Sequence, residues 1–118
     1  MRISFLSALI LPAIAVADDA SFFREKVRPI LANTCFKCHS HEAGKMKGGL
    51  VLDSREGMLT GGDTAAAIVP GKPEDSLLIK AVSYSDPDLQ MPPNKGDSKK
   101  LAASQIAILT EWVKLGAP

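Results

Sequence analysis

Two cysteines and a histidine fall within five residues of the chain, in the order Cys35, Cys38 and His39. Two thiols at this spacing can reach the two vinyl groups along one edge of a porphyrin and become thioethers. A histidine directly after the second cysteine can then offer an imidazole nitrogen to the iron. The pattern uses every cysteine of the chain, and it predicts a covalently attached haem c.

The same residues are compatible with three other kinds of site. A C-x-x-C pair can be a redox dithiol, but that role is typical of a βαβ context and the sequence has no strand-rich pattern. A zinc site needs about four ligands. His41 would complete such a set, although His39 follows Cys38 so closely that tetrahedral closure would be strained. A plain disulfide between Cys35 and Cys38 is the third alternative for an exported chain.

The first 17 residues have the pattern of a secretory signal peptide. Arg2 gives a basic start, an apolar stretch follows, and Ala15-Val16-Ala17 is a small-x-small cleavage site. The apolar stretch is shorter than the ~20 residues of a membrane span, with a retained anchor as the alternative. We therefore expect a leader over residues 1–17 and one small domain over residues 18–118, exported to the periplasm or otherwise out of the cytoplasm, without stable membrane insertion.

The charges of the mature domain balance. The leader holds one of the 14 basic residues, Arg2, and none of the 13 acidic ones. A neutral domain lacks the basic face that nucleic acid requires, so we expect no nucleic-acid partner. Aromatic residues make up only 5% of the chain, and a buried porphyrin would supply apolar bulk that so small a domain otherwise lacks.

Helical patterns precede and follow the cysteine motif. Helices are expected over residues 21–33, 55–59, 74–82 and 102–115. Pro29 should kink or shorten the first of them, because a proline inside a helix removes a backbone donor. Residues 84–96 carry three prolines and should be irregular.

Haem iron bound by one histidine usually has a second axial ligand, for which the candidates are Met46, Met58, Met91 and His41. His41 and Met46 follow His39 too closely to reach round the ring easily, and a helical methionine such as Met58 is more often core. Met91 lies far downstream in a proline-stiffened loop, which holds a weak thioether ligand at little entropic cost. Met91 is our predicted second ligand, with a five-coordinate or water-ligated iron as the alternative.

A sulfur ligand opposite an imidazole favours ferrous iron and leaves no open position for a substrate. The predicted function is single-electron transfer by a monomeric carrier that is not itself an enzyme and that exchanges electrons with redox partner proteins. One alternative is a haem enzyme or gas sensor with an open distal site. Another is a docking module, derived from a larger multidomain protein, in which the haem only staples the fold.

Several further motifs resemble the planctomycete-type cytochrome c domain, a member of the class I cytochrome c group. With CFKCH (35–39) they are FREKVRPIL (23–31), GGL (48–50), LDSR (52–55), IVPGKPE (68–74), MPP (91–93) and WVKLGAP (112–118). The resemblance spans almost all of residues 18–118. It implies an all-α, class I cytochrome c-like fold whose N- and C-terminal helices cross around one covalently bound haem, with His39 proximal and Met91 distal.

The resemblance also implies that Phe23 and Trp112 meet where these helices cross. The haem propionates need donors, and Arg55 is our candidate, with an ordinary surface charge as the alternative. Members of the family usually carry a Ser or Thr cap at the last helix, which Leu101-Ala102-Ala103-Ser104-Gln105 lacks, at a cost of ~1 kcal/mol. The domain commonly heads a much larger protein. Because this sequence stops at Pro118, a free-standing carrier and a remnant of a longer chain both remain open.

Overall fold

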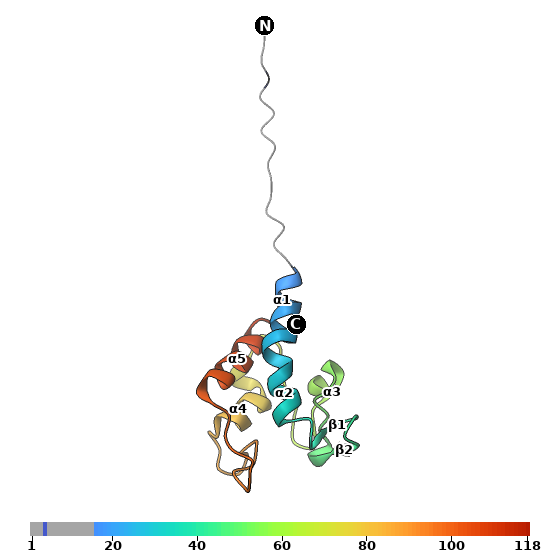
Figure 1. Cartoon of the computed structure of the whole chain (residues 1–118), viewed down its shortest axis with the longest axis vertical. Helices are drawn as coiled ribbons and strands as arrows, with labels where there is room; N and C mark the ends of the chain where they lie inside the picture. The colour runs from blue at the N-terminus through green and yellow to red at the C-terminus, as the bar shows by residue number, and fades with distance from the viewer. Residues whose placement is uncertain (1–3, 5–15) are drawn as a thin grey trace.

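The computed structural model describes residue 4 and residues 16–118, which form a set of short helices with one small sheet (Figure 1). In chain order the elements are α1 (Val16–Phe22), η1 (Phe23–Val27), α2 (Arg28–Thr34), β1 (His39–Ser40), β2 (Lys45–Met46), η2 (Lys47–Gly49), α3 (Arg55–Thr60), η3 (Pro73–Asp75), α4 (Leu77–Ser83) and α5 (Ala103–Lys114). The antiparallel pair β1–β2 corrects the expectation of an all-α chain to a helix-rich one. Strands of two residues are too short to leave an alternating pattern in the sequence.

The elements α1, η1 and α2 follow one another without a break, so Pro29 does not end the first helix. The N–H of Arg28 bonds to the carbonyl of Phe23, five residues back, which makes η1 a π-helical turn. A proline ring presses on the carbonyl four residues before it. The wider turn directly before Pro29 removes that conflict, and the helix continues to Thr34.

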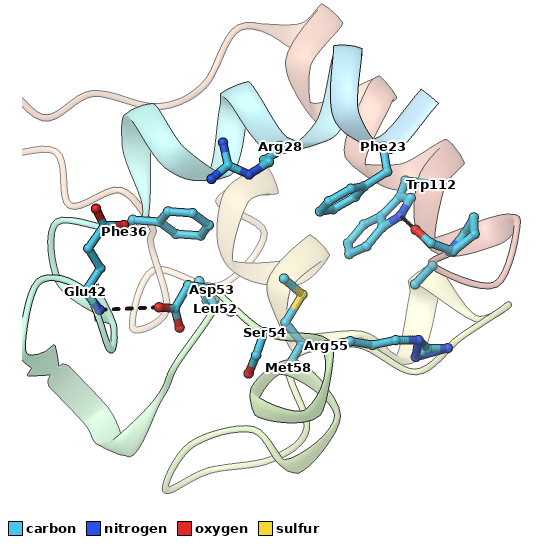
Figure 2. Close-up of a pocket in the computed structure, with 12 residues that line it drawn as sticks. Phe23, Arg28, Phe36, Glu42, Leu52, Asp53, Ser54, Arg55, Met58 and Trp112 are labelled. Carbon is cyan, nitrogen blue, oxygen red and sulfur yellow. Dashed lines mark hydrogen bonds between the residues drawn. The ribbon is translucent and has the colours of Figure 1, made fainter. Parts of the chain in front are cut away.

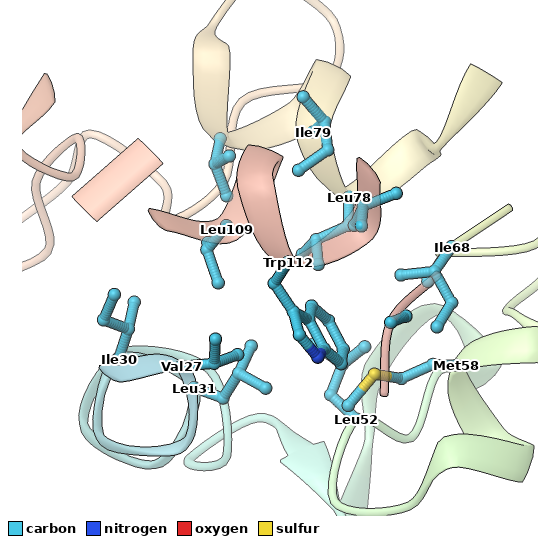
Figure 3. Close-up of a cluster of buried hydrophobic side chains, with 14 of the residues drawn as sticks. Val27, Ile30, Leu31, Leu52, Met58, Ile68, Leu78, Ile79, Leu109 and Trp112 are labelled. Atoms are coloured by element: carbon cyan, nitrogen blue, oxygen red, sulfur yellow. The ribbon is translucent and has the colours of Figure 1, made fainter. Parts of the chain in front are cut away.

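The core lies between this N-terminal helical segment and α5. Val27, Ile30 and Leu31 pack with Leu109 and Trp112 in one buried cluster (Figure 3). The ring centroids of Phe23 and Trp112 are 5.6 Å apart, at an interplanar angle of 36°. The expected meeting of these two aromatic side chains is therefore confirmed, and η1 contacts α5 (Figure 1).

The helix expected over residues 74–82 is divided at Ser76. Ser76 is fully buried and has extended backbone between η3 and α4. Its hydroxyl accepts the N–H of Val69 at 2.8 Å and donates to the carbonyl of Lys72 at 2.9 Å. The side chain thus satisfies polar groups of the preceding turn, and the α-helix begins one residue later.

Among the helices of residues 16–118, none is long and apolar enough to cross a membrane. Most of the expected leader, residues 1–17, lies outside the described residues. The expected cleavage point after Ala17 falls in the first turn of α1. The division into leader and domain stays a prediction.

Candidate haem-binding site

Cys35, Cys38 and His39 are gathered on one turn that prolongs α2. The N–H of Cys35 donates to the carbonyl of Leu31 at 2.9 Å, and the N–H groups of Cys38 and His39 donate to the carbonyl of Cys35 at 3.3 and 3.1 Å. Both thiols are free, so the disulfide alternative is not realised. Within residues 16–118 no three metal-binding side chains converge on a point, so the four-ligand zinc cage is not formed either.

The thiol of Cys35 is held in its protonated form. Burial raises the pKa of this thiol, and the hydroxyl of Thr34, 3.5 Å from Sγ, lowers it only in part. Because reactivity follows the thiolate, a raised pKa lowers the reactivity of Cys35 towards oxidants near neutral pH. The turn therefore presents two unpaired sulfur atoms, of which Cys35 is protected.

The backbone of His39 is fixed by the segments that follow it. Its carbonyl accepts the N–H of Leu52 at 2.8 Å, and in the β1–β2 pair it lies opposite Met46. The Nδ1 atom of His39 is buried and has no hydrogen-bond partner among the described residues. His39 thus carries one buried ring nitrogen without a described partner, directly after the second cysteine.

Met91 lies in the irregular stretch expected from the prolines, which we call the Met91 loop (residues 84–100). Its N–H donates to the carbonyl of Ala81, at the end of α4, at 3.1 Å. The hydroxyl of Tyr84 donates to the carbonyl of Pro92. The side chain of Met91 is 39% exposed, so its sulfur is not committed to the core.

The other three candidate ligands are placed differently. Met58 is a core residue, only 3% exposed, which is the common fate of a helical methionine. Met46 is the cross-strand neighbour of His39 and is 56% exposed. The ring of His41 is bonded through Nδ1 to Oδ1 of Asp53 at 3.1 Å.

A family model described as Planctomycete cytochrome C matches residues 35–95. The matched stretch begins at Cys35 and includes His39 and Met91, and it covers more than half of the chain. The chain belongs to the Planctomycete cytochrome C family. Membership of this cytochrome c family indicates a haem-binding electron carrier. No curated protein and no solved structure matches the chain.

A cavity of about 410 Å³ opens beside the crossing of the N- and C-terminal helices of this cytochrome (Figure 2). Phe23, Met58 and Trp112 form much of its apolar wall, and Arg55 lies at its edge. The predicted attachment and ligand residues are not part of its lining, namely Cys35, Cys38, His39 and Met91. Phe36, which lies between the two cysteines, does line the cavity together with Arg55, so the cavity reaches one side chain of the Cys35–His39 turn (Figure 2).

Arg55 is exposed, and its Nη2 lies 3.4 Å from the carbonyl of Gly116 after the end of α5. That contact ties α3 to the C-terminal segment, where the indole Nε1 of Trp112 also donates to the carbonyl of Pro118 at 2.9 Å. The described contact is thus the one expected of a structural surface arginine. The role of Arg55 towards a propionate stays a prediction.

Asp53 forms a polar clasp with the turn after His39, which the sequence alone did not indicate. Its Oδ2 accepts the N–H of His41 at 2.9 Å. It also accepts the N–H of Glu42 at 3.4 Å (Figure 2). Desolvation raises the pKa of Asp53, but these N–H groups and the ring of His41 outweigh it, so the pKa lies below its ordinary value. The sequence gives no recognisable sign of this contact. Asp53 lies twelve positions after His41, and only the folded path of the chain brings the two together.

Glycines also bring two loops of the cytochrome into close contact. The carbonyl of Gly48 accepts the N–H of Asp63 at 2.8 Å. A Cβ on Gly62 would lie 2.4 Å from that same carbonyl oxygen, and a Cβ on Gly49 would lie 2.6 Å from Oδ1 of Asp63. The two Gly-Gly pairs of the sequence therefore lie at the same loop–loop contact, where a side chain would not fit. The only sequence feature that could have indicated this contact is the occurrence of the two pairs.

Proposed function

We propose that this protein is an exported, mono-haem c-type cytochrome that transfers single electrons and is not itself an enzyme. Haem c would be attached through Cys35 and Cys38, with His39 and Met91 as its axial ligands. When bound, the haem iron supplies one-electron redox chemistry, and methionine ligation raises its reduction potential. The family match carries the proposal, because it runs from the first cysteine of the motif to just beyond Met91.

The chemistry of the attachment turn supports this assignment. Both sulfur atoms are unpaired and lie on one turn, where they can face one edge of a porphyrin. A histidine that binds a metal through one ring nitrogen usually donates a hydrogen bond from the other. Here the bond to Leu52 fixes the backbone of His39, while its buried Nδ1 has no such hydrogen bond among the described residues. We take Nε2 as the ligand atom.

The placement of Met91 supports its role as the second ligand. Its backbone is anchored to the end of α4, while its side chain remains partly exposed. Met58, by contrast, would have to leave the core to reach an iron, and burying a methionine contributes a few kcal/mol to folding. A filled sixth position leaves no room for a substrate, which favours an electron carrier over a haem enzyme or gas sensor.

The proposed fold, export and monomeric state are supported by the terminal helices, the N-terminal residues and the net charge. Contact between Phe23 and Trp112 supports a class I cytochrome c-like arrangement in which the terminal helices cross beside the haem. The leader-like residues 1–17 support export. With balanced charge we expect a monomer that meets its redox partner proteins in brief encounters, without strong electrostatic steering.

The test uses protein exported from cells competent in haem attachment. Intact-mass measurement should show one haem per chain, and Cys35→Ser with Cys38→Ser should abolish it. The ferric protein should show the weak near-infrared sulfur-to-iron charge-transfer band. Met91→Ala should remove this band and keep the haem, whereas Met46→Ala, a control at another exposed methionine, should keep both.

Three results would contradict parts of the proposal. A mature chain without added haem mass would remove its basis. A charge-transfer band that survives Met91→Ala would show that another residue is the distal ligand. Tight binding of cyanide or carbon monoxide at low concentration by the unaltered protein would favour a haem enzyme or gas sensor.

A further inference from the structure

We infer that Tyr84 is a positioning residue that holds the Met91 loop in the arrangement from which Met91 binds iron. The inference rests on the proposed function, because it takes Met91 as the distal ligand. Tyr84 is the single tyrosine of the chain and directly follows α4. Its hydroxyl donates to the carbonyl of Pro92, the residue next to Met91.

Two hydrogen bonds to the end of α4 bracket Met91. On its N-terminal side, the N–H of Met91 donates to the carbonyl of Ala81 at 3.1 Å. On its C-terminal side, the Tyr84 hydroxyl reaches the carbonyl of Pro92. Pro92 and Pro93 have no N–H to donate, so the backbone after Met91 cannot tie itself to the helix. A side-chain donor is required there, and Tyr84 provides it.

The other hydrogen bonds described within the Met91 loop are local. Leu89 bonds back to Asp86 at 3.0 Å, and Lys95 and Ser98 bond to each other at 3.1 and 3.2 Å. These bonds do not attach the loop to a helix. The hydroxyl of Ser85 donates to the carbonyl of Lys80 in α4 at 3.2 Å, and the N–H of Tyr84 donates to that of Ala81 at 3.3 Å, but both hold only the first two residues of the loop, six or more before Met91. The anchoring of Met91 therefore depends on Ala81 and Tyr84.

The backbone of Tyr84 supports a specific role for its side chain. It has left-handed backbone, with φ 59° and ψ 28°, at the C-terminal end of α4. That conformation favours glycine or asparagine and is costly for a bulky residue. The Tyr84 hydroxyl makes a bond to Pro92 that a glycine could not make, which is the contribution that we assign to this side chain. The ammonium of Lys100, 5.6 Å from the ring centroid, adds a cation–π contact from the far end of the loop.

A thioether is a weak ligand, so its occupancy depends on how firmly the loop presents it. Removal of one hydrogen bond typically changes an equilibrium constant, here that between bound and dissociated Met91, about five-fold. Tyr84→Phe deletes the hydroxyl and keeps the ring that Lys100 contacts. In the haem-loaded ferric protein, we expect imidazole to displace Met91 and bind about five-fold more tightly in this variant.

Two further measurements accompany the imidazole titration. The amide hydrogen of Met91 should exchange faster in Tyr84→Phe, since the loop opens more often. The charge-transfer band should disappear at a lower temperature than in the parent, ahead of global unfolding. Thr110→Val is the matched control, because it deletes a hydroxyl that donates to the carbonyl of Ile106 within α5 at 2.7 Å. This control should leave the affinity for imidazole unchanged.

A double-variant comparison separates this inference from the proposed function. In a Met91→Ala background, Tyr84→Phe should no longer alter imidazole binding. The inference is overturned if Tyr84→Phe leaves imidazole affinity, amide exchange and band as in the parent, or if Thr110→Val raises the affinity equally. If Met91→Ala itself changes neither the band nor the imidazole affinity, the assignment of the distal ligand fails instead.

Discussion

The backbone around His39 is bonded to several neighbouring segments, whereas the backbone around Met91 is bonded to the end of one helix. In the His39 region (residues 35–63) such bonds link Cys38 to Lys47, His39 to Leu52 and Gly48 to Asp63, at 3.1, 2.8 and 2.8 Å. The fully buried Ser40 hydroxyl adds a bond to the carbonyl of Phe36 at 2.6 Å. In the Met91 loop nearly every residue from 91 to 100 is exposed.

This difference suits the two axial ligands that we propose, which are of unequal strength. An imidazole placed by a turn and a strand is held whether or not iron is present. A thioether on an exposed loop is held by few contacts, so its dissociation needs only local opening and not unfolding of the core. The two regions should therefore respond differently to substitution, and the following predictions test that difference.

Gly61→Ala should cause the largest loss of stability, because it disrupts the packing of the His39 region. Gly61 has φ +74°, and a Cβ there would lie 2.1 Å from the carbonyl oxygen of Ala65. With ψ −167°, Gly61 lies in a backbone region essentially restricted to glycine, so strain of about 1–3 kcal/mol would add to overpacking of about 1–3 kcal/mol. We expect the free energy of unfolding, measured by denaturant titration, to fall by the sum of these.

Gly71→Ala is the matched control for this prediction. Gly71 also has positive φ, +81°, but a Cβ there would meet nothing within 4 Å. Its loss should be limited to the strain of about 1–2 kcal/mol. Equal losses in the two variants would show that the loop around Gly61 yields easily and that the His39 region is not firmly packed there.

Asp53→Asn should change how the stability of the His39 region depends on pH. The folded-state pKa of Asp53 lies below its ordinary value of 3.8. Its carboxylate therefore contributes stability that is fully present above that value and is lost as the pH falls through the lower, folded-state pKa. At neutral pH the parent should be more stable than Asp53→Asn, and the difference in unfolding free energy should vanish in acid.

Asp86→Asn provides the comparison from the Met91 loop. Oδ1 of Asp86 accepts one N–H, that of Asp88, at 2.9 Å. An asparagine retains that acceptor, so we expect little change in unfolding free energy at neutral pH. Two results would contradict a stabilising role of the Asp53 clasp. One is a loss of unfolding free energy in Asp86→Asn as large as that in Asp53→Asn. The other is a difference in unfolding free energy between the parent and Asp53→Asn that persists in acid.

Local patterns predicted the parts of the molecule that depend on local spacing. The Cys35–His39 motif lies on one turn because four residues of backbone suffice to form it. The apolar stripe of the last helix is buried at Leu109 and Val113, as helical periodicity requires. Phe23 and Trp112 meet as the resemblance implied, since each lies on the inward face of a terminal helix.

Features that depend on contacts formed only in the folded chain were not predictable from local patterns. The clasp of Asp53 and the bond from Tyr84 to Pro92 each join residues that only the folded path brings together. The strand pair at His39 is set by a turn and not by alternation. The helix division at Ser76 follows from a buried hydroxyl that competes for backbone groups. At Asp53, Tyr84 and Ser76 a polar side chain decides the local structure through a partner that the sequence does not identify.

Ala102→Ser should have the smallest effect and should sharpen the comparison. Ala102 caps α5 directly after the Met91 loop, and its N–H donates to Oε1 of Gln105 at 2.9 Å. Gln105 thus provides half of a capping box, while alanine has no oxygen to accept the helix N–H in return. Serine would add that acceptor, so the free energy of unfolding should rise by about 1 kcal/mol. Because Met91 is tied to α4, the imidazole affinity of the ferric protein should stay unchanged; a weaker affinity would show that α5 also anchors the Met91 loop.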